Sequence, residues 1–177
     1  MDLFSAPCVM SRAWGMPSRD TFDCRPIGEF VARWMKDSSW SIDPFARNKR
    51  IASVTNDLNP ATCAEFHMDA EDFLVKMRTG PKFDLAIMDP PYSPRQISEC
   101  YKEAGLTVGM KETQNAVLYA RVRAALASVL IPGAVVLSFG WNSSGMGKKY
   151  RATQLEILLV SHGGAHNDTI CLAERMP

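Results

Sequence analysis

The stretch that decides the fold is FDLAIMDPPYSPRQ, residues 83–96. Its first half, Phe83 to Met88, is a nearly continuous apolar run, which is typical of a strand in the middle of a parallel sheet. The run ends at Asp89-Pro90-Pro91-Tyr92. Two prolines fix φ at about −65° and remove two backbone donors, so regular structure cannot continue. The segment is either an ordinary surface turn or a rigid platform that holds a carboxylate and an aromatic ring at the end of a strand.

Length and composition describe an ordinary globular chain. It has 177 residues, of which 46% are hydrophobic and 22% charged, so the simplest expectation is one folded domain over residues 1–177. The formal net charge of +1 gives no global signal for nucleic acid, whose binding would need a local basic patch. We find no apolar run of the roughly 20 residues that a membrane helix needs, and no signal peptide, so no membrane partner is expected.

The five cysteines form no CxxC pair. An odd number of cysteines without metal-site spacing argues against both a disulfide framework and a zinc site. We therefore expect no metal, a reducing cytosol, and cysteines that serve as small buried apolar residues.

Predicted strands and helices alternate along the chain. Strands are expected at 40–45, 51–60, 66–69, 83–89 and 133–142, helices at 26–38, 70–80, 94–105 and 111–131, two strands around HGGAHND within 153–175, and an irregular segment at 1–24. The order predicts an α/β fold, with a mostly parallel sheet whose edge is an antiparallel C-terminal hairpin. Too few residues separate the first two strands for a helix, so either that crossover is a loop or a single turn, or the expected strand limits are wrong.

Four of these strands end in an acid, namely Asp43, Asp57, Asp69 and Asp89. One such acid is usually a turn or cap residue. Four on neighbouring parallel strands would meet outside the carboxyl ends of the sheet, where doubly wound folds bind their ligands. Asp57 follows the second strand and is placed to accept hydrogen bonds from ribose hydroxyls, and Asp69 could accept from an adenine amine.

Several motifs occur together in one order. They are TFDCRPIGEFV at 21–31, DPF at 43–45, NDLNP at 56–60, HMDAEDFL at 67–74, DPPY at 89–92, and the closing stretches PGAVVLSFGWNSSGMGKK and EILLVSHGGAHNDTICLAE. This set, which covers roughly residues 15–175, resembles the S-adenosylmethionine-dependent N6-adenine DNA methyltransferases of the small phage and prophage type. The resemblance implies a Rossmann-like class I methyltransferase fold, DNA as the partner, and methyl transfer from S-adenosylmethionine to the N6 amine of adenine, with S-adenosylhomocysteine as product.

The resemblance also assigns roles to residues. The catalytic set is Asp89, Pro90, Pro91 and Tyr92, in which the Asp89 carboxylate and the Pro90 carbonyl accept from the amine and Tyr92 stacks on the base. The cofactor set is Pro26, Ile27, Asp43, Pro44, Phe45, Ala46, Arg47, Asn48, Asp57, Leu58, Asp69, Ala70 and Asp89. From their positions in the sequence, we expect the substrate set to be Tyr92, Ser93, Arg95, Gln96, Trp141 and Asn142. Two alternatives stay open here: Ser93, Arg95 and Gln96 as a helix start with a solvated arginine, and Trp141 as a core residue. We expect the two histidines in HGGAHND to be hairpin residues and not ligands.

The cofactor motif departs from the family pattern. The family continues DPF with glycines, as in DPFxGxG, whereas this chain has Ala46-Arg47-Asn48, in which Arg47 and Asn48 could act as substitutes. No separate target-recognition domain is expected, and a chain this small could form a homodimer to gather DNA-binding surface. Two alternatives stay open: an RNA or protein amino-group methyltransferase, and a degenerate, non-catalytic nucleic-acid-binding protein. If phage or prophage encoded, the chain would work in the cytoplasm of a bacterial host.

Overall fold

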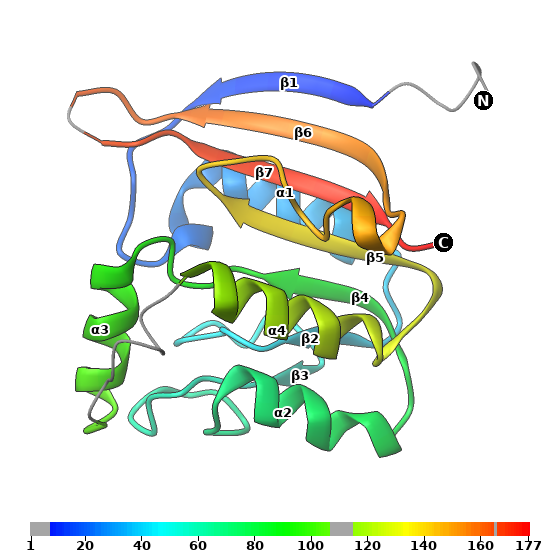
Figure 1. Cartoon of the computed structure of the whole chain (residues 1–177). Coiled ribbons are helices and arrows are strands. Elements are labelled where there is room, and N and C mark those ends of the chain that lie inside the picture. The colour runs from blue at the N-terminus through cyan, green and yellow to red at the C-terminus, as the bar shows by residue number, and fades with distance from the viewer. Residues whose placement is uncertain (1–7, 107–114, 165) are drawn as a thin grey trace.

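The structure is a computed structural model, and it describes residues 8–106, 115–164 and 166–177. Within these residues, seven strands form one sheet in the order β1-β6-β7-β5-β4-β2-β3 (Figure 1). The strands are β1 Val9–Trp14, β2 Ser41–Asp43, β3 Val54–Thr55, β4 Phe83–Met88, β5 Leu130–Gly140, β6 Thr153–Ser161 and β7 Thr169–Arg175. The helices are α1 Arg25–Met35, α2 Ala70–Lys76, α3 Pro94–Glu103 and α4 Asn115–Ala127, with short 3-10 turns at Thr21–Asp23, Met77–Thr79 and Lys148–Tyr150.

The sheet is mostly parallel, as predicted. β2 pairs in parallel with β3 and β4, and β4 pairs in parallel with β5. β7 runs antiparallel to both β5 and β6, which confirms the C-terminal hairpin. The expected antiparallel edge was wrong, however, because β7 lies inside the sheet and β6 and β1 lie beyond it.

The edge strand β1 lies within the segment expected to be irregular. It pairs in parallel with β6 from Val9 opposite Glu156 to Trp14 opposite Ser161. Most of its side chains are exposed, so the strand carries no alternation of buried and exposed residues. Backbone hydrogen bonds to β6 therefore hold β1 in place, and such bonds leave no pattern in the sequence.

Helices cover both faces of the sheet, α1 one face and α2 and α4 the other (Figure 1). The burial of β4 shows how the sequence produces these layers. Leu85 and Ile87 pack with the α1 cluster that includes Phe30, whereas Ala86 and Met88 pack in the cluster of α2 and α4. Because successive strand residues point to opposite faces, a strand buried on both sides must be apolar throughout, and this explains the run noted in the sequence.

The crossover from β2 to β3 confirms the expected short connection. The two strands are parallel, with Ile42 opposite Val54, and residues 44–53 between them contain no helix. The expected strand at 66–69 is reduced to one bridge between Asn56 and Phe66, after which Asp69 caps α2. The predicted helix at 111–131 corresponds to α4, and its expected start lies outside the described residues.

Two general features complete the description. None of the helices in the described ranges is both long and apolar enough to cross a membrane. Cys24 and Cys171 are buried, whereas Cys63 and Cys100 are exposed, so the expectation that the cysteines fill the core holds for only part of the set.

Candidate active site

A pocket of about 300 Å³ lies beyond the carboxyl ends of β2, β3 and β4 and against α3. This volume is at the lower end of the range for small-molecule and cofactor sites. The pocket brings together most of the residues predicted for a site. Those that line it are Pro44, Phe45, Arg47, Asn48, Asp57, Leu58, Asp69, Ala70, Asp89, Pro90, Pro91, Tyr92 and Gln96.

Other predicted residues lie outside the lining. Ile27 is a buried core residue of α1, and Asp43 and Ala46 are buried too. Arg95 is exposed and forms an ion pair with Glu99 in the next turn of α3. Predicted residues that do not line the pocket are Pro26, Ile27, Asp43, Ala46, Ser93, Arg95, Trp141 and Asn142.

Asp89 and Tyr92 form a coupled pair at the end of β4. The Tyr92 hydroxyl donates a hydrogen bond to Asp89 Oδ1. Burial raises the pKa of Asp89 above its usual value, while hydrogen bonds from the Tyr92 and Thr21 hydroxyls and the charge of Arg47 oppose this shift. Burial also raises the pKa of Tyr92 well above its usual value, and the Asp89 carboxylate adds to the effect. The phenol is thus a stable donor to the carboxylate.

The start of α3 holds Tyr92 in place. Ser93 is the N-cap, and its hydroxyl accepts from the Gln96 backbone N–H at 3.2 Å. The Gln96 side chain reaches back and accepts from the Tyr92 N–H at 2.7 Å. These two bonds resemble a capping box, except that the Gln96 side chain accepts from the residue before the N-cap instead of from the N-cap itself. The Ser93 and Gln96 side chains therefore both bind the local backbone.

The Tyr92 ring also lies beside the Trp141 ring. The two ring centroids are 5.9 Å apart, and the ring planes meet at an angle of 60°.

Asp43 is a fully buried acid at the end of β2. Its Oδ1 accepts from the Phe45 N–H at 2.9 Å, whereas its Oδ2 has no hydrogen-bond partner among the described residues. Burial raises the pKa of Asp43 well above its usual value, and the charges of Asp89 and Asp57 raise it further. A buried oxygen without a partner is costly, and the raised pKa favours the protonated, neutral form of this carboxyl.

Asn56, to which the sequence interpretation gave no role, connects backbone segments at the base of the site. It is fully buried, and its Nδ2 donates to the Pro44 and Met68 carbonyls at 3.1 and 3.0 Å. Its Oδ1 accepts from the Met68 N–H at 3.0 Å. One side chain thus joins the connections that follow β2 and β3 to the segment that leads into α2. Its position just before Asp57 gave no sign of this, because the partners are distant in sequence.

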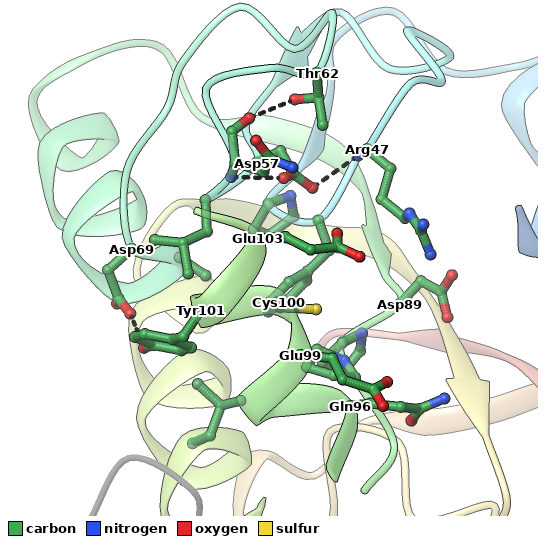
Figure 2. A pocket seen from close by; sticks show the side chains of 18 of the residues that line it. Arg47, Asp57, Thr62, Asp69, Asp89, Gln96, Glu99, Cys100, Tyr101 and Glu103 are labelled. Atoms are coloured by element: carbon green, nitrogen blue, oxygen red, sulfur yellow. Dashed lines mark hydrogen bonds between the residues drawn. The ribbon is translucent and has the colours of Figure 1, made fainter. Parts of the chain in front are cut away.

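Asp57 and Asp69 lie on two walls of the pocket (Figure 2). Asp57 accepts from the backbone N–H groups of Arg47 at 3.0 Å and Asn59 at 2.8 Å. Asp69 accepts from the Glu71 N–H at 2.9 Å and from the Tyr101 hydroxyl at 2.9 Å. A carboxylate has about four acceptor positions, so both acids can still accept from a ligand.

Of the wall formed by α3, the sequence analysis predicted Gln96 and missed Glu99, Cys100 and Glu103. All four line the pocket from one face of this helix (Figure 2). Their spacing of three, four and seven residues is that of a single helical face, which is the signal that could have found them. Further lining residues not predicted are Arg19, Thr21, Asn59, Thr62, Met68, Tyr101 and Leu118.

Comparison with known proteins places this geometry in a fold family. No family model and no curated protein matches the sequence. Among solved structures, the N-methyltransferase NodS from Bradyrhizobium japonicum WM9 superposes with a TM-score of 0.60 at 10% identity, over 90% of this chain and 98% of NodS. The chain has the fold of the class I methyltransferases.

Two further structures share this fold. NodS in complex with S-adenosyl-L-homocysteine superposes with a TM-score of 0.58 at 10% identity, over 90% of each chain. TrmN from Thermus thermophilus superposes with a TM-score of 0.55 at 16% identity, over 85% of this chain and 48% of TrmN. At these identities the likeness concerns the fold, and the chemistry must be argued from the residues of the pocket.

Proposed function

We propose that this chain transfers a methyl group from S-adenosylmethionine to the exocyclic N6 amine of adenine in DNA. One observation carries the proposal: Asp89-Pro90-Pro91-Tyr92 at the end of β4 lines the same pocket as Asp57 and Asp69. The pocket therefore combines acceptors suited to an amine with acceptors suited to a nucleoside.

The donor set fits the cofactor. Asp57 and Asp69 can accept from ribose hydroxyls and an adenine amine, and an acidic site suits a positively charged sulfonium. NodS, which shares the fold, was crystallised with S-adenosyl-L-homocysteine. When bound, S-adenosylmethionine would supply an electrophilic methyl group.

Asp89 and Pro90 would act on the acceptor amine. The amine is a poor nucleophile because its lone pair is delocalised into the adenine ring. An Asp89 oxygen and the Pro90 carbonyl would accept from its two N–H groups and stabilise the positive charge that develops in the transition state. Tyr92 holds Asp89 Oδ1 in this structure, so the amine would displace that hydroxyl or bind the second oxygen. The prolines keep the carbonyl in a fixed direction.

Tyr92 and Trp141 would receive the target base. Their rings are adjacent, and Trp141 is 46% exposed at the end of β5. Extruding a base from duplex DNA costs a few kcal/mol. Stacking on an aromatic ring returns about 1–3 kcal/mol. The exposed Trp141 and the partly buried Tyr92 therefore offer a stacking surface at the side of the site where Asp89 lies.

Specific observations bear on the alternatives. Glu99 and Glu103 in the pocket wall would repel phosphates, which favours an acceptor other than nucleic acid, such as a protein amino group. Against a degenerate, non-catalytic protein stands Arg47, which adopts the left-handed conformation that a motif glycine would supply, with φ 49°. The turn after β2 thus keeps its shape without glycine.

The test is transfer of label from S-adenosylmethionine to unmethylated DNA, to RNA, or to no added acceptor. We expect incorporation into DNA by the wild-type chain and none by an Asp89→Ala variant. Incorporation into RNA or into the protein alone would replace the DNA proposal with the corresponding alternative. No incorporation, with cofactor bound, would favour a non-catalytic role.

A further inference from the structure

Arg47 stands where the resemblance leads one to expect glycine. Its φ of 49° lies in the left-handed region, where residues other than glycine are uncommon. Its backbone N–H donates to Asp57 Oδ2 at 3.0 Å, and this bond fixes the turn. Glycine would form the same turn without strain, so the backbone alone does not require an arginine here.

The Arg47 side chain is held at the pocket wall. Nη1 donates to the Arg19 carbonyl at 3.3 Å, and Nε lies 3.6 Å from Asp20 Oδ1. The guanidinium has five N–H donors, and among the described residues Nη2 donates no hydrogen bond. A side chain fixed in this way presents its remaining donors to the pocket, which it lines.

The pocket has two unlike ends. Figure 2 shows Arg47 and Asp89 on one side and Asp69 with Tyr101 on the other, with Asp57 between them. The Asp69 end offers carboxylate acceptors, which suit the amine and hydroxyl donors of a nucleoside. The Arg47 end offers guanidinium donors, which suit a carboxylate or a phosphate and pair with it in two parallel hydrogen bonds.

We propose that Arg47 binds the α-carboxylate of the cofactor and thereby fixes its amino-acid tail beside Asp89. The inference rests on the proposed function, because it assumes that the cofactor is S-adenosylmethionine. With its nucleoside at Asp57 and Asp69, the tail would extend toward the end of the pocket that holds Arg47 and Asp89. Arg47 is a binding residue in this account and takes no part in proton transfer.

The same guanidinium could instead bind a phosphate of the acceptor, so the experiment separates the two anions. Isothermal titration calorimetry would compare S-adenosylmethionine with decarboxylated S-adenosylmethionine, which keeps the nucleoside, the sulfonium and the amine. The variant is Arg47→Gly, which preserves the left-handed turn and the N–H that binds Asp57. The matched control is Arg25→Ala, which removes an exposed arginine paired with Glu29 on α1.

We expect Arg47→Gly to weaken S-adenosylmethionine about 10- to 100-fold, the range for a charge-assisted hydrogen-bonded pair, and to leave the decarboxylated compound within about twofold. Arg25→Ala should leave both affinities unchanged. Equal weakening of both compounds, or no weakening of either, would overturn the inference.

Three other outcomes also overturn it. Unchanged cofactor affinity with weaker binding of an unmethylated DNA oligonucleotide would assign Arg47 to a phosphate. If the wild-type chain binds neither cofactor compound, the proposed function itself fails, and a wild-type chain that binds both equally well rejects only the role of the carboxylate.

Discussion

At the scale of single residues, Asp89 carries the proposed chemistry. It is an acceptor placed at a strand end, held by Tyr92 and with a pKa raised by burial. Removing one preorganised polar group of this kind typically costs about 10²- to 10³-fold in rate. We expect Asp89→Ala to lose methyl transfer by at least this factor, while its circular dichroism spectrum and melting profile stay those of a folded chain. Substantial transfer by a folded Asp89→Ala protein would remove the carboxylate from the mechanism.

Asp43 allows a prediction about stability. Its pKa is raised well above the usual value, first by burial. The folded state therefore holds a proton that the unfolded chain releases above its pKa of about 3.9, and stability falls as the pH rises from there through the folded-state pKa. Asn at this position removes that loss and replaces the unpartnered oxygen with an amide.

We expect Asp43→Asn to be more stable than the wild type near neutral pH, because a neutral amide has no charged form whose burial opposes folding. The gain should disappear as the pH falls below about 4, where the wild-type carboxyl becomes protonated in the unfolded state as well. Urea unfolding of both proteins at several pH values measures this. A variant that is less stable than the wild type near neutral pH would show that the carboxylate is satisfied in the folded chain.

Single residues of the candidate site were predictable only where a side chain with suitable chemistry directly follows an expected strand. Asp57, Asp69 and Asp89 follow expected strands, and all three line the pocket. Asn56 could not be assigned, because its partners come from residues distant in sequence.

At the scale of elements, the buried His162 adds a side-chain link between the end of β1 and the start of β7. His162 Nδ1 lies 2.6 Å from the Gly15 carbonyl, just after β1, and its Nε2 lies 2.8 Å from the Thr169 hydroxyl. Arg12 within β1 also donates to Ser161 at 3.1 Å. The histidines between β6 and β7 were expected to be simple hairpin residues, and His162 has this additional structural role.

We expect His162→Ala to destabilise the chain by about 1–3 kcal/mol, because it leaves the Gly15 carbonyl and the Thr169 hydroxyl without their partner. The loss should be local. Amide hydrogen exchange should become faster in β1 and at the start of β7, and stay unchanged in β4, which lies in the buried centre of the sheet. Equally faster exchange in β4 would mean that His162 supports the whole sheet.

The elements that the sequence predicted are those with a local signal. β4 and β5 have long apolar runs, and Asp69 and Ser93 cap their helices as side chains of this type do. β1 has exposed side chains and β3 has only two residues, so neither shows a periodicity of its own. Pairing with distant strands creates both, and a local pattern cannot reveal such pairing.

At the scale of the whole molecule, ligand binding should be visible as stability. The pocket joins the ends of three strands to α3, so a ligand that fills it can bind only the folded chain. A ligand present at 100 times its dissociation constant adds about 2.7 kcal/mol to the free energy of unfolding. We expect S-adenosylhomocysteine to shift the urea midpoint of the wild-type chain accordingly.

The matched comparison is Asp57→Ala, which removes an acceptor from the pocket together with the partner of the Arg47 and Asn59 N–H groups. The same ligand concentration should produce a much smaller shift in this variant. An equal shift in both proteins would show that Asp57 does not contact the ligand.

The class of fold was predictable from the alternation of strands and helices, but the complete strand order was not. The hairpin of β6 and β7 was expected at an edge, and β1 covers that edge instead. A strand order depends on contacts between segments far apart in sequence, here between residues 9–14 and 156–161. The pocket at the carboxyl ends followed from the parallel strands alone.

The most direct test of the central claim identifies the methylated product. The wild-type chain and Asp89→Ala would each be incubated with unmethylated DNA and S-adenosylmethionine carrying a deuterated methyl group, and the DNA digested and analysed by mass spectrometry. The account predicts deuterated N6-methyldeoxyadenosine from the wild-type chain and none from the variant. Label on another nucleoside, or no labelled nucleoside from a chain that binds the cofactor, would contradict it.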